Sequence, residues 1–247
     1  MHTQQHIINH LFELFTYLAK QNNSALTIDN SYKAVTTKDS SWPNFIFDVN
    51  PSKETFKAIA SDIADNKLPK HIILDSSQVD ANEDLLIENN FLPIAEWSCL
   101  KLENTIPKKV QSKNLNIKKI TTPQELTEWI NVASTGFETL NLKLFKNCLH
   151  NKEFALYGGY SNNKMVTTAL LFYHNDTAGI YHIVTLPEER GNGFGSEIFS
   201  YCEQESIDNG ATQVIAQSTS DGLNAWMKTG MKSYGNFYLF CWNKPKQ

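Results

Sequence analysis

The spacing of apolar and polar residues predicts a chain in which strands alternate with amphipathic helices. In the second half, runs of apolar residues that suit single strands cover 115–120, 154–160, 165–173, 179–185, 214–217 and 237–242. Apolar residues recur at helical spacing between these runs, first at Leu126, Trp129, Ile130 and Ala133, and later at Phe194, Ile198 and Cys202. Further helices are expected over about 138–149 and 221–229.

Turn and capping residues mark the boundaries of several of these elements. Thr122-Pro123-Gln124-Glu125 is a capping box with proline at the first helical position, so a helix should begin there. Asn162-Asn163 separates two apolar runs and tolerates the positive φ of a tight hairpin. Asn209-Gly210 should end the helix that begins near residue 194.

The first half shows a related but weaker pattern. It predicts helices over about 4–20, from Pro51 onward and over 82–89, and strands over 44–49, 71–74 and 94–102. Residues 103–114 include Pro107 and several lysines and have no clear period, so we expect the boundary between two parts there. The predicted domains are therefore 1–108 and 115–247.

A glycine-rich segment is the most informative local feature. The apolar run 179–186 ends at Pro187, and Arg190-Gly191-Asn192-Gly193-Phe194-Gly195 then leads directly into a helix. A strand that passes through glycines into a helix directs several backbone N–H groups to one place, where the helix dipole favours an anion such as a pyrophosphate. A P-loop is excluded because Ser196-Glu197 follows the last glycine, and the dinucleotide fingerprint fails on its glycine spacing.

This segment resembles the acyl-CoA loop of the GNAT superfamily of N-acetyltransferases, in which Gln/Arg-x-x-Gly-x-Gly/Ala follows a strand that ends in Val/Thr-x-Pro. Thr185-Leu186-Pro187 and the residues from Arg190 to Gly195 occupy those positions. The resemblance covers about residues 115–242. It implies an α/β fold with a mixed, mostly antiparallel sheet flanked by helices, a bulge in the motif strand, and acetyl-CoA (coenzyme A) as the cofactor.

The same resemblance assigns the coenzyme-binding residues. The pyrophosphate would be bound by the backbone of Gly191, Asn192, Gly193, Phe194, Gly195 and Ser196, with Arg190 adding charge. The pantetheine arm would pair with the backbone of Ile183, Val184 and Thr185, with one N–H facing the thioester oxygen. Residues 1–108 resemble the degenerate N-terminal half of two-part GNAT proteins, expected to lack a cofactor and to wall one side of the substrate site.

The resemblance does not settle the catalytic residues. The tyrosine that acts as general acid in many members is replaced by Trp226, whose indole N–H donates a hydrogen bond but gives up no proton at useful pH. Tyr181 and His182 are the titratable candidates for a base, and strand alternation would turn only one of them to the site. Both Trp226 and His182 have an alternative interpretation as packing residues. Glu138 could recognise a cationic amine or simply start a helix.

Composition limits the other function classes. Lys and Arg total 22 against 26 Asp and Glu, a net charge of −4 that is atypical of nucleic-acid binding. No apolar run is long enough to span a bilayer, so no membrane partner is expected. The four cysteines are widely spaced and suggest neither a metal site nor a disulfide framework, which favours a cytoplasmic protein.

Two hypotheses follow from these residues. The first is an N-acetyltransferase that transfers an acetyl group from acetyl-CoA directly to a primary amine of a small molecule in a ternary complex, with transfer of a longer acyl chain as a variant. The second is an acyl-CoA-binding sensor or partner module with weakened catalysis, for which the arguments are Trp226 and Gly179, which stands where some GNAT members have a glutamate early in the motif strand. The sequence leaves the acceptor amine and the oligomeric state open.

Overall fold

A computed structural model describes residues 2–21, 25–103, 114–137 and 139–244. The chain forms two compact units, one of residues 1–99 with 234–247 and the other of residues 100–233. Strands β5 (Phe91–Leu102) and β11 (Met231–Trp242) contribute residues to both units. No helix of the described residues is long and apolar enough to cross a membrane.

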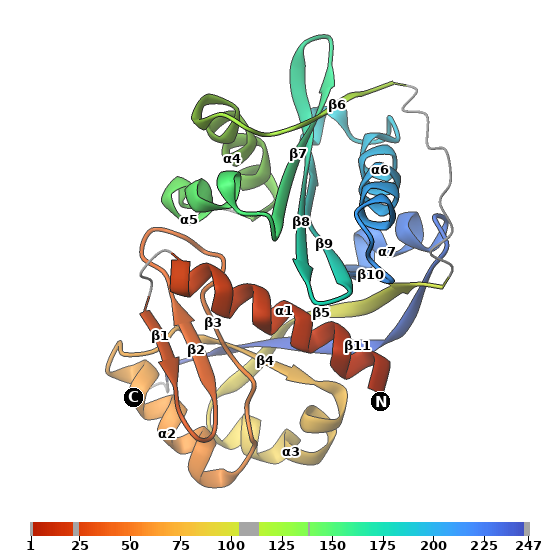
Figure 1. Cartoon of the computed structure of the whole chain (residues 1–247). Helices are drawn as coiled ribbons and strands as arrows, with labels where there is room; N and C mark the ends of the chain where they lie inside the picture. Colours follow the sequence, from red (N-terminus) through yellow and green to blue (C-terminus); the bar gives the residue numbers. More distant parts are fainter. Residues whose placement is uncertain (1, 22–24, 104–113, 138, 245–247) are drawn as a thin grey trace. The chain divides into compact units, whose positions relative to one another are not determined.

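The first unit is a mixed sheet with helices on both faces. Its elements are α1 (His2–Gln21), β1 (Ala25–Ile28), β2 (Lys33–Thr36), β3 (Phe45–Phe47), α2 (Lys53–Ala64), β4 (His71–Asp75) and α3 (Ser76–Glu88). The strand order is β1-β2-β3-β4-β11, and only β3 and β4 pair in parallel among these neighbours. Figure 1 shows α1 on one face of this sheet and α2 and α3 on the other.

Alternation along β3 explains how both faces of this sheet are covered. Phe45 and Phe47 point to α1, where Phe15 stacks on Phe45 at a ring-centroid distance of 5.3 Å. Ile46, between them, belongs to the cluster that contains Phe56 of α2 on the opposite face. All three consecutive residues of β3 are buried because α1 covers one face of the strand and α2 covers the other.

The second unit carries the glycine-rich segment. Its elements are β6 (Asn116–Lys119), α4 (Pro123–Phe137), α5 (Leu142–Lys146), the 3₁₀ helix η1 (Asn147–His150), β7 (Phe154–Ser161), β8 (Lys164–His174), β9 (Thr177–Thr185), the 3₁₀ helix η2 (Pro187–Glu189), α6 (Phe194–Asp208), β10 (Gln213–Ser218) and α7 (Ser220–Met227). The strand order is β5-β10-β9-β8-β7-β6. The pairs from β6 to β9 are antiparallel and β9 pairs with β10 in parallel, so the predicted mixed, mostly antiparallel sheet is confirmed.

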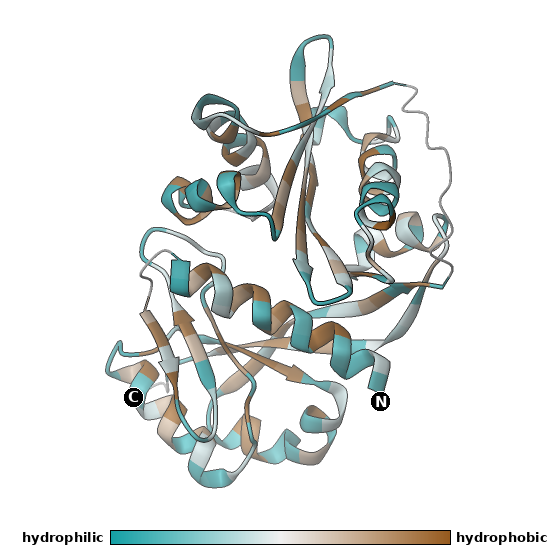
Figure 2. Ribbon diagram, in the orientation of Figure 1, coloured by the Kyte–Doolittle hydropathy of each residue, from teal (hydrophilic) through white to brown (hydrophobic). Residues whose placement is uncertain are grey.

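Helices cover both faces of this second sheet as well. In Figure 1, α4 and α5 lie on one side of β7, β8 and β9, and α6 and α7 lie on the other. Trp129 of α4 is fully buried, whereas Ile198 and Phe199 of α6 pack with Ala169 and Ile180 on the opposite face. Figure 2 shows most of the hydrophobic colour on the strands and hydrophilic residues on the outward faces of the helices. The apolar residues whose spacing predicted these helices and strands therefore form the core of this unit.

The predicted boundary signals are largely confirmed. The N–H of Glu125 donates to Thr122 Oγ1 at 3.2 Å and the N–H of Thr122 donates to Glu125 Oε2 at 3.0 Å, which is the predicted capping box. Asn162 and Asn163 have φ values of 50° and 64°, as their hairpin requires. Gly210 ends α6 with φ of 88°.

Other elements differ from the prediction. The helix expected over 138–149 is divided into α5 and η1, and residue 138 lies outside the described residues. Strands β1 and β2 were not predicted, and α3 begins at Ser76 because a capping box between Asp75 and Gln78 starts it early. Most of the predicted boundary 103–114 lies outside the described residues, and residues 237–241, which the prediction assigned to the second half, pair with β4 of the first unit.

Candidate active site

The glycine-rich segment adopts the left-handed backbone that its glycines permit. Gly191 and Gly193 have φ values of 84° and 80°, and Gly193 is the residue that caps the N-terminus of α6. A Cβ added at either glycine would meet no heavy atom within 4 Å. Glycine is therefore favoured here by the backbone conformation rather than by crowding, because a left-handed φ destabilises other residues by about 1 kcal/mol or more.

The backbone N–H groups of residues 191–196 are available at the start of α6. The first bond back into the segment is donated by the N–H of Glu197 to the carbonyl of Gly193 at 3.0 Å. No described residue accepts a hydrogen bond from the N–H groups of 191–196, and no side chain caps the helix. Residues 191, 192 and 193 are exposed. These donors and the positive end of the helix dipole together have the chemistry that suits an anion, and we call residues 191–196 the candidate anion site.

Neighbouring side chains fix the segment without using those donors. Arg190 Nε donates to the carbonyl of Thr185 at 3.3 Å, and Asn192 Nδ2 donates to the carbonyl of Glu189 at 3.1 Å. Phe194 is buried and packs with Leu115. These contacts fix the segment and leave its backbone N–H groups without an acceptor among the described residues.

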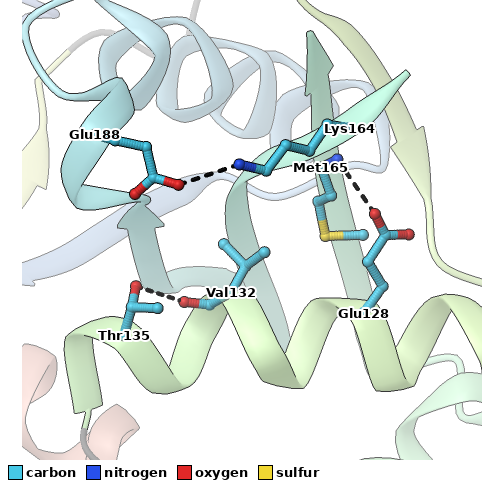
Figure 3. Close-up of polar contacts among 6 residues, drawn as sticks. All are labelled: Glu128, Val132, Thr135, Lys164, Met165 and Glu188. Carbon is cyan, nitrogen blue, oxygen red and sulfur yellow. Dashed lines mark hydrogen bonds and ion pairs between the residues drawn. The ribbon is translucent and has the colours of Figure 1, made fainter. Parts of the chain in front are cut away.

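Two acidic residues near the segment are engaged elsewhere. Glu197, in the first turn of α6, accepts hydrogen bonds from the N–H groups of Asn114 and Leu115 at 3.1 and 3.0 Å. Glu188 of η2 forms an ion pair of 3.1 Å with Lys164 at the start of β8, which Figure 3 shows beside α4. Lys164 therefore offsets the charge of Glu188, and the carboxylate of Glu197 is hydrogen-bonded to the backbone of Asn114 and Leu115.

Strand β9 contains the expected bulge. Thr168 pairs with Val184 and Leu170 pairs with Tyr181, so His182 and Ile183 together oppose Ala169 of β8. His182 has φ of 50°, which is unusual for a residue other than glycine. In the described register, β9 leaves its other neighbour, β10, after the pair Ile180 and Ala216. The last residues of β9 therefore have an edge that is not paired with β10, which we call the open edge (residues 181–185).

Alternation identifies the backbone groups that face the open edge. The N–H of Leu186 donates to the carbonyl of Val166 at 2.9 Å, so the backbone of Leu186 and, two residues earlier, of Val184 faces β8. The backbone groups of Ile183 and Thr185 consequently face the opposite way. The side chain of Val184 packs against α4, where a Cβ added at Gly136 would lie 2.8 Å from Val184 Cγ2.

The structure places both candidate bases in the interior. His182 is 4% exposed and its ring lies 5.8 Å from that of Trp129 and 5.6 Å from that of Phe145. Burial lowers the pKa of His182 to about 3, which makes the imidazole a poor proton acceptor at neutral pH. Tyr181 is also buried, and it directly precedes the two residues of the bulge. This geometry favours the packing interpretation of His182.

Trp226 lies against the first turn of α6. Its ring stacks on Phe199 at 4.4 Å with an interplanar angle of 18°. A Cβ added at Gly195 would be 3.3 Å from Thr185 Oγ1 and 3.8 Å from Trp226 Cη2. The end of β9, the start of α6 and α7 therefore meet around Gly195, and Trp226 both packs on α6 and reaches the candidate site.

The structure brings together most of the residues that the family resemblance assigns to coenzyme binding. Thr167 and Thr168 of β8, which were not predicted, bond to the carbonyls of β9 beside the bulge. Their only signal was a pair of hydroxyl residues in an otherwise apolar strand. Glu138 lies outside the described residues. The described residues contain no group of three or more His, Cys, Asp or Glu that could hold a metal ion.

Comparison with known proteins agrees with this geometry. Residues 123–227 match the model of the acetyltransferase (GNAT) family. A GCN5-related N-acetyltransferase from Kribbella flavida has 12% identity and a TM-score of 0.68, over 94% of this chain and 96% of that one. One from Sphaerobacter thermophilus has 10% identity and a TM-score of 0.61, over 89% and 82%.

A GNAT-family acetyltransferase from Colwellia psychrerythraea has 14% identity and a TM-score of 0.56, over 87% of this chain and 82% of that one. At these identities the likeness concerns the fold. A search of the curated proteins finds no match. The chain therefore carries an acetyltransferase domain of the GNAT family at residues 123–227, within a fold that solved N-acetyltransferases share over most of its length.

Proposed function

We propose that the chain is an acetyl-CoA-dependent N-acetyltransferase that acts on a primary amine of a small molecule. The observation that carries this proposal is the set of N–H groups of residues 191–196, which have no acceptor among the described residues and surround two left-handed glycines. Such a set of donors suits a diphosphate. Membership of the domain in the GNAT family supports the same coenzyme.

The residues of the site divide the binding between two regions. The N–H groups of 191–196 bind the pyrophosphate, and the guanidinium of Arg190 adds positive charge while its Nε remains on Thr185. The backbone groups of Ile183 and Thr185 pair with the pantetheine arm along the open edge, in the manner of an added strand. Val184 contributes through packing rather than through its backbone. When bound, the coenzyme supplies the thioester from which the acyl group is transferred.

Transfer is direct from the thioester to the amine. The neutral amine nitrogen attacks the carbonyl carbon, the C–N bond forms, the C–S bond breaks and the sulfur leaves as a thiolate. The N–H of Ile183 stabilises the charge that develops on the carbonyl oxygen. Water takes the proton lost by the amine, because His182 is buried and poorly basic. Burial raises the pKa of Cys99 and Cys148 to about 12, which argues against either thiol as a covalent relay.

A second candidate function is coenzyme binding without efficient catalysis. Trp226 occupies the place at which the family resemblance predicts a general acid, and its indole stacks on Phe199 instead of offering a proton. A thiolate is nevertheless a good leaving group, since its conjugate acid has a pKa of about 8.5. We therefore favour the enzyme, with the sensor or partner module as the alternative.

One experiment separates the outcomes. Coenzyme A at about one hundred times its dissociation constant should add about 2.7 kcal/mol of stability, which corresponds to a rise of about 5–10 °C in Tm for a chain of this size. Consumption of acetyl-CoA is then measured with a panel of primary amines. A thermal shift with consumption supports the enzyme, and a shift without consumption of acetyl-CoA for any amine supports the binding module. Absence of a thermal shift contradicts both.

A further inference from the structure

Two hydroxyl side chains lie buried in the middle of β8. Thr167 and Thr168 are both 0% exposed, and the strand around them is apolar. A buried hydroxyl is costly unless it forms a hydrogen bond, so each of these residues needs a partner inside the sheet. Both find that partner in the backbone of β9, and Thr167 Oγ1 also lies 3.1 Å from Thr185 Oγ1.

The two hydroxyls bond on either side of the bulge. Thr168 Oγ1 donates to the carbonyl of His182 at 3.0 Å, and Thr167 Oγ1 donates to the carbonyl of Val184 at 2.9 Å. Adjacent residues of a strand point to opposite faces, so the two hydroxyls reach β9 from opposite faces of the sheet. On the same strand, the carbonyl of Ala169, which opposes the bulge, accepts a bond of 3.3 Å from Trp129 Nε1.

The bulge decides which backbone groups reach the open edge. If β9 lost its extra residue and continued the register that Leu170 and Tyr181 define, its later residues would slip by one position relative to β8. A slip of one residue exchanges the two sides of a strand. The backbone of Ile183 would then face β8, and that of Val184 would face the open edge. The left-handed φ of His182 favours this loss, and the threonine bonds oppose it.

We propose that Thr168, assisted by Thr167, is a positioning residue that holds the bulge and so aims the backbone N–H groups of Ile183 and Thr185 at the coenzyme's pantetheine arm. This inference rests on the proposed function. It separates the open edge, which depends on Thr168, from the anion site of residues 191–196, in which no residue is bonded to Thr168.

The test compares two ligands and two substitutions. Thr168→Val removes the hydroxyl at nearly constant volume, and Thr168→Ser keeps it. The ligands are coenzyme A and adenosine diphosphate 3′-phosphate, which contains the diphosphate but lacks the pantetheine arm. Dissociation constants are measured by calorimetry, and kcat and KM for acetyl-CoA follow for an accepted amine. Thr127→Val is the matched control, because its hydroxyl donates to the carbonyl of Pro123 at 2.9 Å on exposed helix α4.

The proposal predicts a specific pattern of dissociation constants and KM values. Thr168→Val should weaken coenzyme A about tenfold and raise KM, because one buried hydrogen bond and the pairing that it supports are lost. Adenosine diphosphate 3′-phosphate should bind the variant within about twofold of wild type, Thr168→Ser should restore coenzyme A, and Thr127→Val should change neither. Equal weakening of both ligands, no weakening of either, or no rescue by serine overturns the proposal. If wild type binds neither ligand, the proposed function fails instead.

If Thr168→Val does not fold, amide hydrogen exchange on the wild-type protein tests which backbone N–H groups of β9 face the coenzyme. Coenzyme A should slow exchange at Ile183 and Thr185, and adenosine diphosphate 3′-phosphate should not. The amide of Val184, which faces β8, should not respond to either ligand. Protection of Val184 in place of Ile183 and Thr185 overturns the proposal.

Discussion

Replacing Gly193 with alanine tests the anion site with little disturbance of the fold. Gly193 has φ of 80° and Gly210, at the opposite end of α6, has φ of 88°. A Cβ added at either position meets no heavy atom within 4 Å. Gly193→Ala and Gly210→Ala should therefore lower the free energy of unfolding by a similar amount, about 1 kcal/mol, from backbone strain alone.

The two variants should differ in coenzyme binding. Residue 193 lies in the middle of the segment 191–196, and relief of the backbone strain at an alanine there would turn the N–H groups of this segment away from the ligand. A hydrogen bond to a charged group contributes about 1.5–3 kcal/mol, so the loss of one raises the dissociation constant about tenfold to a hundredfold. We expect that increase for Gly193→Ala and a change within about twofold for Gly210→Ala.

Calorimetric titration with coenzyme A and urea unfolding without ligand measure the two quantities. Equal dissociation constants in the two variants would refute the reasoning, because strain without a local effect would then explain the result. Wild-type affinity in Gly193→Ala would refute it as well.

Three further predictions concern residues around the open edge. Trp226→Tyr should raise kcat by about tenfold or more, because a phenol can protonate the leaving thiolate, whereas Trp226→Phe should not; equal kcat values would contradict this role of the position. Burial lowers the pKa of His182 from 6.5 to about 3, so between these pH values the unfolded chain binds a proton that the folded chain does not. The free energy of unfolding should therefore fall by about 1.4 kcal/mol per pH unit as the pH drops through this range. His182→Asn should remove that slope in urea unfolding between pH 7 and 4, and an unchanged slope would show that other groups cause it. Gly136→Ala should lower the free energy of unfolding by about 1 kcal/mol or more, since its Cβ would overlap Val184 despite the better helix propensity of alanine; a more stable variant would contradict the close packing of α4 on β9.

Local sequence signals predicted the parts of the fold that depend on local chemistry. The capping box at Thr122 and Glu125, the hairpin at Asn162-Asn163 and the end of α6 at Gly210 are each set by residues a few positions apart. The anion site also belongs to this class, because the left-handed φ of Gly191 and Gly193 and the start of α6 follow from one short segment.

Features that depend on partners distant in sequence could not be predicted in the same way. Residues 237–241 of the last strand pair with β4 in the first half of the chain, and no sequence pattern near either strand indicates this pairing. The bulge places a histidine at φ of 50°, stabilised by Thr168 on another strand and by aromatic rings of α4 and α5. Alternation alone therefore does not determine which way His182 points. Strand β1, with its exposed and half-buried residues, lacks a hydrophobic run that would reveal it.

A crystal structure of the chain with coenzyme A would test the central claim most directly. We predict pyrophosphate oxygens within hydrogen-bonding distance of backbone nitrogens of residues 191–196, with the pantetheine arm bonded to Ile183 and Thr185. A coenzyme bound elsewhere, or a diphosphate held by side chains while those nitrogens contact only water, would contradict it.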